Sequence, residues 1–223
     1  HGLIRRAETR LAALGLPAAD FRLRVRSGTS ARLAAAWLAL GIAALVGSGL
    51  FSLLLVLART PGLKDAFPVA NFFQVALVAH VDLSVLAWFV AFAGVLWSLA
   101  CDERGLVLAR IALALCAAGT LAMCVAPAWS PAVPVLANYI PVIDNAVFLG
   151  GLAAMGAGVA LAVGRTLWAG RALGPVLDGD AATRWAILAS AVSAARLLSP
   201  GWPAPAGRAD QHELPLTRVD LPR

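Results

Sequence analysis

Charged side chains are scarce in this sequence. Asp, Glu, Lys and Arg make up 13% of the 223 residues, whereas hydrophobic residues make up 61%. Soluble domains contain about 25% charged and about 45–50% apolar residues. The composition therefore excludes an ordinary soluble domain, and the mean hydropathy of +0.82 indicates a membrane protein. Lysine is almost absent, since Lys64 is the only one among 18 basic residues.

Cysteine is also scarce, and its spacing excludes two kinds of site. The three cysteines are Cys101, Cys116 and Cys124, and no pair has the CxxC spacing. A disulfide framework or a thiolate metal site is therefore not expected. We interpret the three side chains as small buried hydrophobes.

The net charge of +6 and the pI of about 10.5 are compatible with nucleic-acid binding. The arginines, however, cluster at the ends of apolar segments. That placement is typical of membrane topology rather than of a basic binding surface. We therefore expect this chain to contact the lipid bilayer and not a nucleic acid.

Four uninterrupted apolar runs predict membrane-spanning helices. Each has about the 20 residues or more that are needed to cross about 30 Å of hydrocarbon. Only helices or closed barrels satisfy the backbone in lipid, and runs of this length are helices. The sequence therefore predicts an all-α, polytopic transmembrane helix bundle of about four full spans plus an interrupted fifth. The predicted spans are Leu33–Leu57, Val69–Leu99, Leu106–Val125 and Pro141–Leu167.

The chain divides into three parts by composition. Residues 1–32 form a basic N-terminal arm, residues 33–195 the transmembrane helical domain, and residues 196–223 a polar, proline-rich tail. A fifth apolar run begins at Trp185 but stops at Arg196, which is too short for a comfortable span. We interpret it either as a helix interrupted by truncation or a frame change, or as a helix before a disordered tail.

Arginine placement also predicts the orientation. The N-terminal arm and the links that follow the second and fourth spans are rich in arginine, whereas the link Ala128–Asn138 carries no charge. The positive-inside rule then places the N-terminus in the cytoplasm.

His80 is the candidate binding residue, because it is the only histidine in a predicted span. It lies about 12 Å along the helix from Phe72, at 1.5 Å per residue. Small residues share its helix face: Ala76, Ser84, Ala87, Ala91 and Gly94. Such a stripe allows close helix packing, with His80 merely hydrogen-bonded. Alternatively it leaves room for a flat cofactor whose iron His80 ligates.

The spans contain two other notable features, the acidic residue Asp82 and a row of small residues in the fourth span. Asp82 points about 200° away from His80 on a regular helix, so the two cannot ligate one ion. It is expected to pair with a neighbouring helix or to line a water pocket. In the fourth span, the spacing of Gly150, Ala154, Gly158 and Ala162 predicts a face for helix packing.

Residues 71–89, NFFQVALVAHVDLSVLAWF, resemble the second helix of subunit I of the haem-copper oxidases. The likeness is greatest to the B-type oxygen reductases and their cbb3-type and nitric oxide reductase relatives. A histidine of that helix is an axial ligand of the low-spin haem in this family, and His80 matches it. Residues 137–141 and 165–168 are similar to the same family more weakly, and the resemblance covers about residues 31–195.

The resemblance implies a membrane electron-transfer component, the N-terminal part of a terminal oxidase subunit I, in a bacterial inner membrane. It implies that His80 binds low-spin haem b, that a cytochrome c-like protein donates electrons, and that other subunits or later helices are partners. The family's copper ligands and remaining haem ligands have no counterpart here. This chain alone is therefore expected neither to bind copper nor to reduce oxygen. The alternative is a non-catalytic membrane scaffold subunit without a cofactor.

Overall fold

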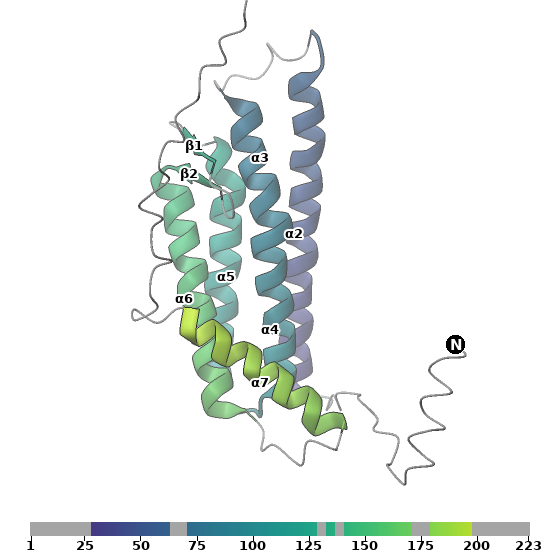
Figure 1. Ribbon diagram of the computed structural model, residues 1–223, viewed down its shortest axis with the longest axis vertical. Helices are drawn as coiled ribbons and strands as arrows, with labels where there is room; N and C mark the ends of the chain where they lie inside the picture. The colour runs from purple at the N-terminus through teal and green to yellow at the C-terminus, as the bar shows by residue number, and fades with distance from the viewer. Residues whose placement is uncertain (1–27, 63–70, 129–132, 137–140, 171–178, 198–223) are drawn as a thin grey trace, which may run out of the picture.

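The computed structural model describes residues 28–62, 71–128, 133–136, 141–170 and 179–197. Within them, four long helical segments run side by side as a bundle, and a further helix crosses it obliquely near one end (Figure 1). The fold is therefore an all-α helical bundle, as predicted. The four segments are long and apolar enough to cross a membrane.

Three of the predicted spans match the observed helices closely. The first is α2, Thr29–Arg59. The second is a continuous segment of α3, Phe72–Asp82, the π-helical turn η2, Leu83–Ala87, and α4, Trp88–Ala100. The third is α5, Leu106–Val125, which ends in the short 3₁₀ turn η3, Ala126–Ala128.

The fourth span begins later than predicted. It is α6, Ala146–Ala169, and not a helix from Pro141. The preceding residues form β2, Val142–Asp144, which pairs antiparallel with β1, Val133–Val135. Asn145 fixes the helix start, because its side chain accepts a 2.7 Å hydrogen bond from the Phe148 backbone N–H, as an N-cap does.

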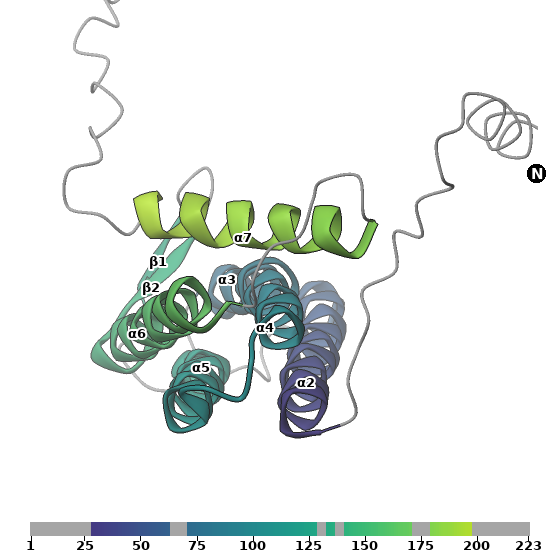
Figure 2. The ribbon, with the colours of Figure 1, turned by 90° about the horizontal axis from the view of Figure 1, so that it is seen from below.

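The fifth apolar run forms a helix that begins before Trp185. This helix, α7, covers Gly179–Leu197 and is not among the helices suited to span a membrane. It lies across α6 and α4, and Figure 2 shows it along one side of the bundle. Ile187 and Ala191 are buried against the bundle, and Trp97 Nε1 donates a 3.1 Å hydrogen bond to Ser190 Oγ.

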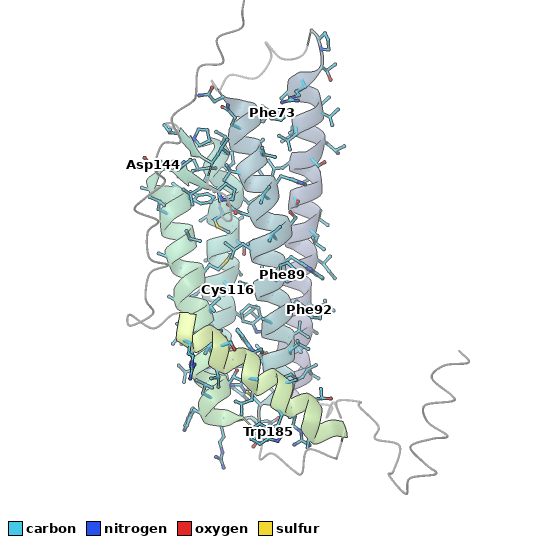
Figure 3. All side chains as sticks on the ribbon, viewed as in Figure 1. Phe73, Phe89, Phe92, Cys116, Asp144 and Trp185 are labelled. Carbon is cyan, nitrogen blue, oxygen red and sulfur yellow. The ribbon has the colours of Figure 1, made fainter. Side chains whose placement is uncertain are left out.

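The bundle has two distinct ends. At one end, called here the α7 end, α2 and α5 begin and α4 and α6 finish. At the other, called the hairpin end, β1 and β2 pair and Arg59 lies over the Phe73 ring, 4.0 Å from its centroid. In Figure 3, Phe73 and Asp144 lie near the hairpin end and Trp185 near the α7 end.

Helices α5 and α6 pack through small residues, although not with the predicted register. Gly158 and Ala162 are buried as expected, but Gly150 has open space around it. The glycine in contact is Gly151, whose missing Cβ would lie 2.9 Å from Gly119 O on α5. Buried Cys116 belongs to this interface, where its Sγ is 3.6 Å from Met155 O.

Arg165 binds the link between α4 and α5 at the α7 end of the bundle. This side chain on α6 is only 4% exposed. Its Nε donates to Arg104 O at 3.0 Å, and its Nη2 donates to Asp102 O at 2.7 Å. The guanidinium therefore satisfies two carbonyls of the link between α4 and α5. Nothing in the sequence beyond a basic residue at the end of an apolar run indicates this contact.

The outer surface of the bundle suits lipid. On α2, the outward side chains are large and apolar, including Ile42, Leu53 and Val56, which are 52%, 63% and 66% exposed. Apolar surface of this extent marks a membrane or interaction surface, and with four suitable helices it indicates a membrane protein. The predicted arm and tail lie almost wholly outside the described residues.

Candidate functional site

His80 is held by α2 through one serine. The His80 Nδ1 lies 2.9 Å from the backbone oxygen of Ser48 and 2.9 Å from its Oγ. The same Ser48 Oγ donates a 3.0 Å hydrogen bond to the His80 backbone oxygen. Ser48 is 3% exposed and follows Gly47, where an added Cβ would lie 3.3 Å from the Leu83 side chain, so a small residue there lets the two helices approach closely.

One tautomer satisfies all these groups. If Nδ1 carries the proton, it donates to Ser48 O, and the Ser48 hydroxyl is then free to donate to His80 O. Nε2 is then the nitrogen with a lone pair. Among the described residues it has no hydrogen-bond partner, and the His80 side chain is partly exposed. The geometry therefore fixes the ring and leaves one ligating nitrogen available.

The His80 carbonyl lies at an irregular point of the helix. It also accepts a 2.8 Å hydrogen bond from Ser84 Oγ, and the π-helical turn η2 begins at Leu83. A π-helical turn inside a long helix is rare and is frequent at functional sites. Ser84 therefore contacts the His80 backbone and not the imidazole.

The stripe of small residues, for which helix packing and room for a cofactor were alternatives, packs against helices of the bundle over much of its length. Helix α2 covers it at two points: Trp37 packs directly on Gly94, and a Cβ on Gly41 would lie 3.2 Å from Ala91 Cβ. Ala76 and Ala87 are also fully buried. The small side chains serve helix packing, which was one of the two interpretations of the stripe.

Asp82 lies two residues after His80 and is buried within the bundle. It is 1% exposed, and its Oδ2 is buried without a hydrogen-bond partner in the described part of the chain. The pairing with a neighbouring helix that we considered is not seen at this oxygen. The described residues also contain no cluster of three or more His, Cys, Asp or Glu that could hold a metal ion.

These residues fit one axial position of a haem and no more. A ligating histidine commonly donates its other ring N–H to a backbone carbonyl, which fixes the tautomer and the ring orientation. His80 and Ser48 O have this arrangement. Nε2 of His80 would hold the iron of such a haem, because Nδ1 is already bonded to Ser48 O.

Ser48 was not found from the sequence. The available signal was a polar residue between two glycines in the middle of an apolar run. Its distance of 32 positions from His80 gives no hint of contact, because pairing across two helices depends on their relative shift and rotation.

Replacing Ser48 by Ala tests this contact. The variant loses the hydroxyl that donates to His80 O, while the Ser48 carbonyl remains. We expect the free energy of unfolding to fall by about 0.6 kcal/mol, the mean for interhelical hydrogen bonds in membranes. Ser52→Ala is the control, since Ser52 has no hydrogen bond to another described residue. Equal effects in mixed-micelle unfolding would contradict the contact.

Comparison with known proteins gives two relatives, both uncharacterized. A protein of Rickettsia prowazekii (strain Madrid E) is 45% identical over 65 residues, which are 29% of this chain and 13% of that protein. One of Aquifex aeolicus (strain VF5) is 33% identical over 129 residues, 56% of this chain and 31% of that protein. The chain thus spans less than a third of either relative. No family model and no solved structure matches it.

Proposed function

We propose that this chain is a membrane electron-transfer component, the N-terminal part of a haem-copper terminal oxidase subunit I. In this proposal His80 is an axial ligand of a low-spin haem b through Nε2. The observation that carries the proposal is the fixed ring, with Nδ1 at Ser48 O and Nε2 without a partner among the described residues. The resemblance of residues 71–89 to the oxidase helix supports it.

The chain's own residues have limited roles in this proposal. Ser48 O accepts a hydrogen bond from the His80 Nδ1–H and so keeps the proton on Nδ1, which leaves Nε2 as the electron-pair donor. A haem bound there would supply one-electron transfer through its iron. The second axial ligand and the several imidazoles that a copper site needs would come from further helices or another subunit, because His80 is the only histidine in a span.

A scaffold subunit without a cofactor is the second candidate. The coverage of the small-residue stripe by α2 favours it, because His80 then serves only to join α2 and α3 through Ser48. A reduced-minus-oxidised spectrum of the protein, purified with whatever partners it retains, separates the two candidates. A sharp low-spin haem band is expected, and a flat spectrum from fully assembled protein would favour the scaffold.

We further propose a bacterial inner membrane and a cytoplasmic α7 end. Arg32, Arg104 and Arg110 all lie near this end, as the positive-inside rule requires of the cytoplasmic side. In intact cells, Val135→Cys in β1 should react with a membrane-impermeant maleimide. Arg104→Cys should react only after the cells are opened. The reverse pattern would invert the orientation, and the unsubstituted chain measures the background from the native cysteines.

A further inference from the structure

A cleft between the first turns of α2 and α5 holds two arginines. Arg32 on α2 and Arg110 on α5 line it together with Thr29, and its volume is about 300 Å³. Both arginines are exposed, and neither has a carboxylate partner among the residues that the structure describes. Two positive charges from separate helices therefore line one open space. Helices α2 and α5 lie on the side of the bundle away from α7 (Figure 2).

Apart from Thr29 and the two arginines, the cleft is lined by apolar side chains. Ala36 is one turn beyond Arg32, about 6 Å farther from the α7 end at 1.5 Å per residue. Leu113 lies in the same way beyond Arg110 on α5. The remaining lining residues are Leu33 and Leu106. Ala36 and Leu113 thus lie on the membrane-centre side of the two arginines, while Leu33 is adjacent to Arg32 and Leu106 is about one turn nearer the α7 end than Arg110.

The backbone adds positive charge to this cleft. Both α2 and α5 begin here, and neither has an acidic residue in its first turn or a side-chain N-cap. Unpaired N–H groups and the helix dipole attract anions at such ends. Glu103 lies beside Gly28, 3.4 Å from where a Cβ would be, but it does not line the cleft.

We propose that this cleft binds an anionic phospholipid. Arg32 and Arg110 hold the phosphate, and an acyl chain runs along Ala36 and Leu113. Basic pockets between transmembrane helices are suited to anionic head groups. A soluble phosphate would leave the apolar lining uncovered, and a zwitterionic lipid would bring its own cation toward the two arginines. This site is independent of His80 and of any haem.

Lipid binding to the full chain in neutral detergent tests the proposal. Phosphatidylglycerol and phosphatidylcholine with identical acyl chains are titrated and followed by native mass spectrometry. Phosphatidylglycerol should bind more tightly. Arg32→Gln and Arg110→Gln should each weaken it about fivefold, and the double variant about 25-fold, if each arginine contributes the usual amount near a membrane surface.

Arg104→Gln is the matched control, because it removes one exposed charge at the same end but outside the cleft. It should leave the affinity nearly unchanged, and glycerol phosphate should not displace the lipid. Thermal melting of each variant shows whether the bundle is intact. If the double variant unfolds, the lipid affinities of the two single variants carry the test. The proposal is overturned if both lipids bind equally, if Arg104→Gln weakens binding as much as Arg32→Gln, or if glycerol phosphate displaces the lipid.

Discussion

Gly158→Leu should separate α5 from α6 and strongly destabilise the bundle. A Cβ on Gly158 would lie 2.6 Å from Cys116 Sγ and 2.7 Å from Ala112 O. The carbonyl belongs to the helix backbone and cannot turn aside, so the helices must move apart. Overpacking a tight interface costs about 1–3 kcal/mol, and we expect the free energy of unfolding to fall by the upper part of this range.

Gly156→Leu is the control for this prediction. It makes the same change on the same helix, but nothing lies within 4 Å of a Cβ at Gly156. That variant should unfold like the original chain or be slightly more stable, since leucine favours helix over glycine. Equal destabilisation of the two variants in a mixed-micelle unfolding titration would contradict the close contact of Gly158 with α5.

Arg165→Met should loosen the α7 end of the bundle. The substitution keeps an apolar stem but removes the donors to Arg104 O and Asp102 O. Hydrogen bonds from charged groups contribute about 1.5–3 kcal/mol each, so a loss of about 3 kcal/mol in the free energy of unfolding is expected. Trypsin should also cut faster after Arg104, because the link between α4 and α5 is no longer held.

The comparison variant for Arg165 is Arg104→Met. The Arg104 side chain is exposed, and only its backbone oxygen accepts a hydrogen bond from Arg165. Substitution there should change the stability little. If Arg165→Met and Arg104→Met unfold alike, then the guanidinium of Arg165 does not hold this link.

The long apolar runs were sufficient to predict the helices of the bundle. Length and hydropathy are properties of each segment alone, so the spans of α2, α4 and α5 end within a few residues of the prediction. The beginning of α6 was missed because residues 141–144 are apolar enough to continue a helix. Their strand depends on pairing with β1, which is a contact outside the segment.

Contacts between helices were harder to predict. Gly150 and Gly151 are adjacent and equally small, so the sequence could not decide which one faces α5. The small residues around His80 fitted two interpretations, and the contacts of Trp37 with Gly94 and of Gly41 with Ala91 show that α2 packs on part of this face. Ser48 and Arg165 were missed as partners for the same reason, because their roles depend on how neighbouring helices are shifted and rotated.

The central claim is that His80 offers Nε2 to a haem iron, and replacing His80 by Gly tests it most directly. The purified assembly is compared before and after the substitution by its reduced-minus-oxidised spectrum, with His212→Ala as the control histidine. The account predicts that the low-spin band is lost in His80→Gly, is restored at least in part by added imidazole, and is unchanged in the control. Membrane insertion should persist, because the apolar length of the helix is the same. An unchanged low-spin band in His80→Gly would contradict the account.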